Sequence, residues 1–115
     1  MHELSIAMSI VELAEEEAAQ RGGARVDAIH LKLGALAGVV KKALLSSYEL
    51  ASEGTPLAGS RLVIEDVPVV VYCPSCTAER RSDALQWFRC PDCKGPVSEV
   101  LQGRELQVVA LELQE

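Results

Sequence analysis

The chain has 115 residues, 49% of them hydrophobic and 3% aromatic, with 17 acidic and 11 basic residues and a formal charge of −6. This length suits one domain, or one small domain with a metal-bound module. A negative chain is repelled by phosphates, which counts against nucleic acids and anionic membranes as partners. Residues 1–20 lack the pattern of a signal peptide, and no apolar segment reaches the roughly 18–20 residues that span a bilayer. We therefore expect a cytoplasmic protein.

The chain begins Met1-His2-Glu3, and a histidine in second position can form a small chelate. The imidazole, the terminal amine and the intervening backbone nitrogens can converge on one metal ion. Nitrogen donors in a square arrangement suit Ni(II) or Cu(II). The alternative is a solvated and frayed chain end. The opening residues are thus a candidate metal site whose assignment depends on the rest of the chain.

Residues 4–20 repeat apolar side chains at steps of three and four, which predicts a helix. The serines and glutamates at positions 5, 9, 12 and 16 should occupy its wet face, and Arg21-Gly22-Gly23 should end it with a left-handed glycine cap. The predicted apolar stripe consists of Leu4, Ala7, Met8, Val11, Ala14 and Ala18, widened by Ile6, Ile10 and Leu13.

Residues 25–34 alternate apolar and polar side chains, which predicts a half-buried strand with His30 on its polar face. For His30 we expect a simple exposed strand residue, with an accessory metal role as the alternative. A second helix should begin at Val39 and end before Gly54 and Pro56. Its predicted stripe consists of Val40, Ala43, Leu44, Ser47, Tyr48 and Ala51.

Further strands are predicted at residues 61–66, 97–101 and 105–114, with Pro68 interrupting the pattern after the first of them. In the last strand the apolar parity shifts between Val108 and Val109, which indicates a bulge or twist. The order of elements predicts an α+β fold, with two helices on a three-stranded sheet and an inserted zinc-ribbon-like module of four cysteines. We expect residues 1–67 plus 104–115 to form the main domain and residues 68–103 the metal module.

The inserted module carries two Cys-x2-Cys pairs, Cys73/Cys76 and Cys90/Cys93. Paired cysteines without a secretory context indicate a metal site in a reducing compartment rather than disulfides. Four thiolates with no open position predict a closed structural Zn(II) site, whose negative charge Arg80, Arg81, Arg89 and Lys94 can partly offset. A rubredoxin-like iron centre and a redox dithiol remain alternatives. Trp87-Phe88 should form the small core of the module, or else a stacking surface.

In combination, these features resemble the HypA/HybF family of hydrogenase maturation proteins over essentially the whole chain. The opening residues through Ser5 and the cysteine pairs carry the specific part of the resemblance. The weaker part lies in Leu31-Lys32-Leu33-Gly34, Glu53-Gly54-Thr55, Leu62-Val63-Ile64-Glu65, Gly103-Arg104-Glu105-Leu106 and Leu111-Glu112. Lys41-Lys42 and Ser46-Ser47 depart from the family pattern in the second helix.

The resemblance implies a nickel metallochaperone without a catalytic reaction of its own. His2 would carry transient Ni(II), the Met1 amine and backbone amides would complete the site, and Glu3 would tune it or contact a partner. The implied partners are the GTPase HypB and the large subunit of [NiFe]-hydrogenase, with urease maturation proteins for some members. Nickel affinity should fall as pH drops through about 6–7, because imidazole and amine must lose protons to bind.

Two other classes of function remain open from the residues themselves. One is a zinc-ribbon adaptor that binds protein or nucleic acid, although the negative charge argues against nucleic acid. The other is an electron-transfer or thiol-redox protein that uses the cysteines. Both histidines lie in the first thirty residues and the cysteines are committed to one site, so no nucleophile arrangement stands out.

Overall fold

The structure, a computed structural model, describes residues 2–82 and 89–114. The chain divides into two compact units. We call Met1–Lys32, Gly38–Glu65 and Gln107–Glu115 the helical unit, and Leu33–Ala37 and Asp66–Leu106 the cysteine unit.

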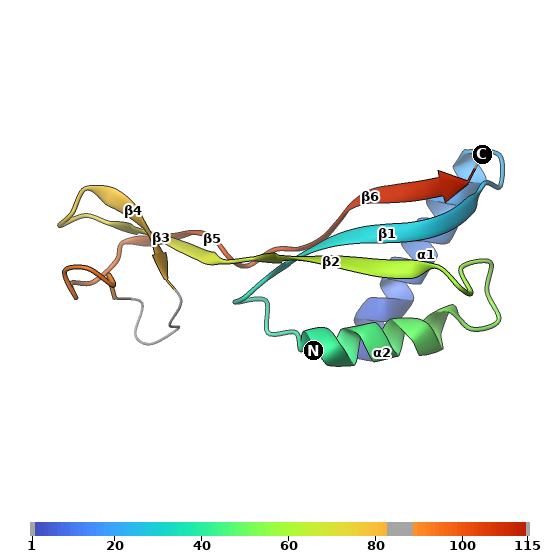
Figure 1. Cartoon of the computed structure of the whole chain (residues 1–115), viewed down its shortest axis with the longest axis horizontal. Coiled ribbons are helices and arrows are strands. Elements are labelled where there is room, and N and C mark those ends of the chain that lie inside the picture. Colours follow the sequence, from blue (N-terminus) through green and yellow to red (C-terminus); the bar gives the residue numbers. More distant parts are fainter. Residues whose placement is uncertain (1, 83–88, 115) are drawn as a thin grey trace. The chain divides into compact units, whose positions relative to one another are not determined.

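The helical unit combines two helices with a three-stranded sheet, as predicted (Figure 1). In Figure 1, β1 and β2 run in the same direction, α2 returns between them, and β6 runs in the opposite direction. The strand order is β2-β1-β6. The elements are α1 (Glu3–Gln20), β1 (Arg25–Gly34), α2 (Lys41–Ser52), β2 (Arg61–Val67) and β6 (Leu106–Gln114).

Helix α1 buries a narrower face than its sequence suggested. The prediction was wrong for Leu4, Met8 and Leu13, whose side chains are 41%, 51% and 44% exposed. At 100° per residue, Leu4 and Met8 lie just beyond one margin of the buried arc and Leu13 just beyond the other. The buried residues are Ile6, Ala7, Ile10, Val11, Ala14 and Ala18.

The end of α1 follows the prediction. Gly22 and Gly23 both have positive φ angles, of 78° and 79°. The Gly23 N–H donates to the Ala18 carbonyl at 2.9 Å and the Gly22 N–H to the Ala19 carbonyl at 3.3 Å. This is the Schellman pattern, which satisfies the last carbonyls of a helix and requires a residue that tolerates the left-handed conformation.

Helix α2 begins at Lys41 rather than at Val39 and buries Leu44, Tyr48 and Ser52. Val40, which was predicted to belong to the apolar stripe, is the N-cap and is 61% exposed. Because the N-cap lies at the edge of the first turn, its side chain need not face the core. The buried Tyr48 hydroxyl shares a 2.5 Å hydrogen bond with the Ser60 hydroxyl, which joins α2 to the residue before β2.

Exposure along β6 changes parity in the middle of the strand, in agreement with the apolar pattern. Leu106 and Val108 are half-buried, and so are Leu111 and Leu113. Val109, which has the same parity as Leu111 and Leu113 and was grouped with them, is instead 46% exposed. The half-buried side chains thus change from even-numbered to odd-numbered positions within β6.

The cysteine unit contains a second sheet, of order β4-β3-β5, that the sequence did not predict as such. Its strands are β3 (Val69–Cys73), β4 (Ala78–Ser82) and β5 (Glu99–Gln102). Strand β5 lies near the strand expected at 97–101. Strand β4 was missed because Ala78-Glu79-Arg80-Arg81-Ser82 has no apolar alternation, and its pairing with β3 holds it in place. Trp87 and Phe88, which were predicted to form the small core of the module, lie outside the described residues.

Two glycines allow three chain segments of the cysteine unit to approach one another closely. A Cβ atom added to Gly34 would overlap the backbone carbonyl of Gly103. The Gly34 N–H donates to the Glu105 carbonyl and the Leu36 N–H to the Gly103 carbonyl, both at 2.7 Å. Gly103 itself has a φ of 122° and lies against Val69. Side chains are excluded here by close backbone approach rather than by turn geometry alone.

Within the described part of the chain, neither helix combines the length and the apolar composition needed to cross a membrane.

Candidate metal centre

Strand pairing brings the first cysteine pair to the turn of a hairpin. Strands β3 and β4 are antiparallel, with Val69 opposite Ser82 and Cys73 opposite Ala78. Cys76 therefore lies in the tight connection between the two strands. The second pair lies in a similar turn, where the Cys90 N–H donates to the Gly95 carbonyl at 2.9 Å and the Lys94 N–H to the Cys90 carbonyl at 3.0 Å.

The four sulfur atoms form one cluster, all within 4.8 Å of one another. Cys73 Sγ lies 3.5 Å from Cys93 Sγ, and Cys76 Sγ lies 3.9 Å from Cys90 Sγ. These separations are far longer than a disulfide bond, and all four cysteines are free. Four sulfurs at about 2.3 Å from a tetrahedral zinc ion would be about 3.8 Å apart. The cluster thus has the size and the donor set of a closed tetrathiolate metal site.

Backbone amides of both turns point at the sulfurs. The Cys76 N–H donates to Cys73 Sγ at 3.4 Å, and the Cys93 N–H donates to Cys90 Sγ at 3.5 Å. The residue after each pair, Thr77 or Lys94, has a positive φ, of 51° and 64° respectively. Non-glycine residues rarely adopt this conformation. Each turn is therefore held in a strained geometry that turns N–H groups toward negative charge.

The thiols differ in their acidity because of these contacts. The Cys93 backbone N–H, acting against burial, lowers the pKa of the Cys90 thiol to about 6. Hydrogen bonds with the Cys93 and then the Cys73 thiol raise the pKa of Cys76 to about 12. One thiolate forms readily in this cluster, but further thiolates repel it unless a cation lies between them. The cluster reaches its fully ionised state only together with a bound metal ion.

An ion pair connects the two turns. Arg80 Nε, on β4 after the first turn, lies 2.7 Å from Asp92 Oδ2 in the second turn. The Nε atom is buried, and its N–H is not directed along a hydrogen bond to any described group, so this contact is ionic rather than a well-aligned hydrogen bond. Partial burial would lower the pKa of the Arg80 guanidinium, but Asp92 and then the Cys76 and Cys90 thiols outweigh burial and raise it.

Two further cations that were predicted to offset the charge of the cluster bond to the backbone of the second turn. Arg89 Nη1 donates to the Lys94 carbonyl at 3.1 Å, and Lys94 Nζ donates to the Pro91 carbonyl at 3.0 Å. Both side chains are exposed. They place positive charge around the second turn, while the Arg80 guanidinium interacts with the sulfurs themselves.

The amino end offers donors of a different kind. Met1 lies outside the described residues. His2 is exposed, is the N-cap of α1, and makes no side-chain capping bond. Its carbonyl accepts the Ile6 N–H at 3.2 Å. The Glu3 carboxylate accepts the Val40 N–H at 3.2 Å, and this bond lowers the pKa of Glu3. The structure thus brings Glu3 to the start of α2, a contact that the sequence did not predict.

His30 has a specific partner rather than being a free strand residue. Its Nε2 atom lies 2.5 Å from Glu112 Oε2, across β1 and β6. Arg61 Nη2 on β2 lies 3.8 Å from the same carboxylate oxygen. The three side chains link the three strands of the sheet. The Nε2 atom of His30 is thus already paired with Glu112.

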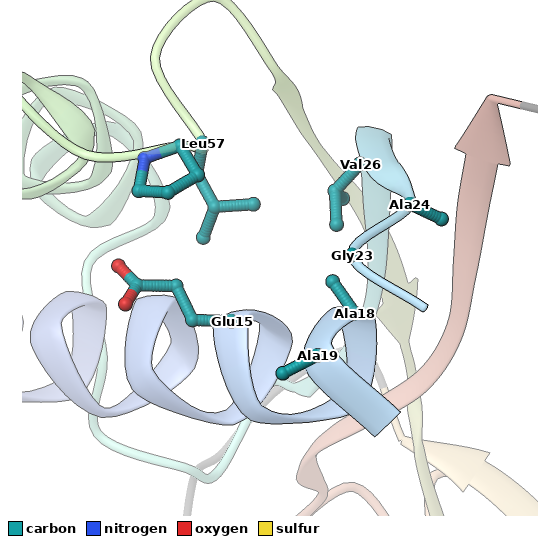
Figure 2. A pocket seen from close by; sticks show the side chains of 8 residues that line it. Glu15, Ala18, Ala19, Gly23, Ala24, Val26 and Leu57 are labelled. Carbon is teal, nitrogen blue, oxygen red and sulfur yellow. The ribbon is translucent and has the colours of Figure 1, made fainter. Parts of the chain in front are cut away.

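A hollow of about 250 Å³ opens beside the end of α1, lined by small and apolar side chains (Figure 2). Figure 2 shows the Glu15 carboxylate at one side of it and Val26 at the other, with Ala18 and Ala19 between them on the helix. It contains one carboxylate and no other side chain that could bind a metal or act as a nucleophile. None of the residues that line this hollow belongs to the cysteine cluster or to the amino end.

A family model described as "Hydrogenase/urease nickel incorporation, metallochaperone, hypA" matches residues 1–113. The chain is 55% identical over 112 residues to a hydrogenase maturation factor HypA from Chloroflexus aurantiacus, covering 97% of this chain and 98% of the relative. It is 49% identical to the corresponding factor from a Roseiflexus species, over 100% of this chain and 94% of the relative.

Two solution structures have similar folds. The Ni metallochaperone HypA from Helicobacter pylori superposes with a TM-score of 0.66 at 25% identity, covering 98% of this chain and 97% of the other. A second HypA structure gives a TM-score of 0.72 at 25% identity, over 99% of this chain and 97% of the other. Sequence and fold therefore agree over nearly the whole length of the chain.

Proposed function

Because the chain belongs to the HypA family of hydrogenase and urease nickel-incorporation metallochaperones, we propose that its amino end binds Ni(II) and delivers it to the large subunit of [NiFe]-hydrogenase. This is a family of maturation factors and not of enzymes, so nickel is cargo rather than a catalyst. The proposed ligands are the His2 imidazole, the Met1 amine and the backbone amides of His2 and Glu3.

The observation that carries this proposal is the position of His2 at the start of α1. The first four N–H groups of a helix have no acceptor within the helix. His2 contributes its carbonyl to the first turn, yet its imidazole is exposed and unused in capping. The nitrogens of the His2 imidazole are therefore available to a metal without breaking a capping bond of α1. Such nitrogens suit square-planar Ni(II).

For the four cysteines we propose a structural Zn(II) ion held by Cys73, Cys76, Cys90 and Cys93. The sulfur separations match a tetrahedron with zinc–sulfur bonds of about 2.3 Å, and no fifth donor is needed. Zinc supplies no redox chemistry here and stabilises the fold of the cysteine unit. We propose that residues 1–67 plus 104–115 act as the nickel-binding domain and residues 68–103 as the zinc-binding module; of these, residues 33–37, 66–67 and 104–106 are grouped by the structure with the cysteine unit.

The proposed partners are the GTPase HypB and the hydrogenase large subunit, with urease maturation proteins as a further set. An exposed chelate supports this transfer, because its ligands can be replaced one at a time by those of an acceptor. Four thiols without disulfides support a reducing location such as the cytoplasm.

Nickel binding to three proteins tests the proposal: the natural chain, His2→Ala, and a chain with two extra residues before Met1. We expect both changes to weaken nickel binding by at least about a hundredfold, equal to about 2.7 kcal/mol, because each removes a donor of the chelate. Equilibrium dialysis measures the affinity, and the zinc content and helical circular dichroism should not change.

The matched control is His30→Ala, which removes the only other histidine of the chain. It should retain wild-type nickel affinity, because His30 is paired with Glu112. Undiminished nickel binding by the extended chain would contradict a site at the terminal amine. Loss of nickel binding in His30→Ala would move the site to the sheet.

A further inference from the structure

The strongest unexplained group in the molecule is the Arg80 Nε–H. Its nitrogen is buried and has no directed hydrogen bond among the described residues. Buried donors are almost always satisfied, because an unpaired one loses its bond to water without replacement. Arg80 Nε lies 2.7 Å from Asp92 Oδ2, so its charge is paired although the contact lacks the direction of a good hydrogen bond.

The groups around Arg80 come from both cysteine turns. Its Nε atom pairs with the carboxylate of Asp92, in the second turn, at 2.7 Å. The thiols of Cys76 and Cys90, one from each turn, help to raise the pKa of its guanidinium. Arg80 lies on β4 shortly after the first turn, so its ion pair with Asp92 joins the first turn to the second.

The negative charge of a tetrathiolate metal site requires a positive charge nearby. A divalent ion with four thiolates carries two net negative charges in a partly buried place, and charges in such places require a counter-charge. Arg80 is a cation whose pKa the Cys76 and Cys90 thiols raise, whereas Arg89 and Lys94 bond to backbone carbonyls of the second turn. The planar guanidinium also suits two acceptors at once, which a lysine ammonium satisfies less well.

We propose that Arg80 is a positioning residue of the metal site: paired with Asp92, it clamps the two cysteine turns around the ion and places a positive charge close to the four thiolates. This inference rests on the proposed metal site at the four cysteines. It adds a role to two residues that are not ligands.

The rate at which zinc passes from the nickel-free, zinc-loaded full chain to a coloured chelator tests the proposal. Arg80→Gln should release zinc about three- to tenfold faster than wild type, the range of one partly exposed charge-assisted contact. Asp92→Asn should have a smaller effect in the same direction. In the double variant, Asp92→Asn should add little to Arg80→Gln, because both act through one contact.

Two further variants separate position from charge. Arg89→Gln, which removes a cation from the second turn, is the matched control and should release zinc at close to the wild-type rate. Arg80→Lys keeps the charge but loses the fork, so its rate should fall between those of wild type and Arg80→Gln. The thiolate-to-metal absorption of the Co(II)-loaded protein provides a second readout, because a change in the charge beside the sulfurs shifts its band position.

Each outcome has a definite meaning. An Arg80→Gln variant that releases zinc at the wild-type rate, or no faster than Arg89→Gln, would overturn the clamp while leaving the metal site intact. Additive effects of Arg80→Gln and Asp92→Asn would show that the two residues act separately and would also overturn it. A wild-type protein that binds no metal at the four cysteines would overturn the proposed site itself and the clamp with it.

Discussion

At the cysteine cluster every candidate ligand is a side chain already in place, whereas at the amino end most candidate donors are backbone nitrogens of an exposed helix start. The four sulfurs lie within 4.8 Å of one another, and N–H groups from both turns already point at them. His2, by contrast, is exposed and unconstrained by any side-chain capping bond. One region is organised without a metal, whereas the other would be organised by the proposed nickel ion.

This difference separates a site that would retain its metal ion from a site that would transfer its metal ion. A preformed, closed set of four thiolates gains nearly all of its binding free energy as stability of the fold, so the ion is kept. A chelate made of a chain end has little structure to lose, so an acceptor can remove its ion one ligand at a time. The proposed carrier of one metal, stabilised by another, would benefit from having the two kinds of site in separate places.

The largest effect is expected from a substitution that removes one ligand of the cysteine cluster and leaves the amino end unchanged. Cys76→Ser should lose the metal of the cysteine unit and unfold that unit, because structural zinc contributes about 10–16 kcal/mol, as much as the whole stability of an ordinary domain. The helical unit, with its own core, should stay folded and keep its nickel stoichiometry. Metal content and an amide NMR spectrum measure both outcomes.

Ser75→Ala, an exposed change within the same turn, is the control and should preserve metal and spectrum alike. A Cys76→Ser protein with full zinc content and a native spectrum of the cysteine unit would contradict the closed four-ligand site. Simultaneous collapse of both units would show that they depend on each other for folding.

The next effect tests whether backbone strain in the first cysteine turn weakens metal binding by the preformed cluster. Thr77 has a φ of 51°, where a β-branched side chain is strained by about 1–2 kcal/mol. Asparagine tolerates this conformation, so Thr77→Asn should relieve part of the strain. We expect the chelator concentration that removes half of the zinc to rise about three- to tenfold.

Ser75→Asn adds the same side chain two residues earlier, at a residue without a positive φ, and should leave that midpoint unchanged. Equal midpoints for Thr77→Asn and wild type would indicate that strain at the turn costs the site nothing.

Features that depend on the spacing of residues along the chain were predicted from the sequence. Features that depend on strand register, or on how much of a helix is covered by the core, were missed. Two Cys-x2-Cys pairs were enough to predict the cluster, because each pair is a single turn. The Arg80–Asp92 contact depends on how β4 pairs with β3, and β4 carries no apolar alternation. The exposure of Met8 depends on how wide a core α1 faces. The overlap that makes Gly34 necessary arises from a residue far along the chain, Gly103.

The smallest expected effect concerns Glu3, whose side chain bonds to the start of α2 and whose backbone amide is a proposed nickel ligand. Its carboxylate accepts the Val40 N–H and thereby stabilises the start of α2. This bond lowers the pKa of Glu3 in the folded protein. A carboxylate whose folded pKa is depressed adds stability above its unfolded pKa, and that stability is lost as pH falls through the folded value. Glu3→Gln should therefore melt at a slightly lower temperature than wild type at neutral pH, and the difference should vanish in acid.

Thermal melts from about pH 7 down to about pH 3 cover both sides of this titration. Glu16→Gln, a change on the same helix, should show no such pH-dependent difference. Nickel binding by Glu3→Gln then decides what kind of site the amino end is. Retained stoichiometry would mean that Glu3 contributes through its backbone amide while its side chain holds α2. If Glu3→Gln lost nickel without any change in melting, the carboxylate would be a ligand. The contrast with the cysteine cluster would then narrow, because the amino end too would depend on a side chain already in place.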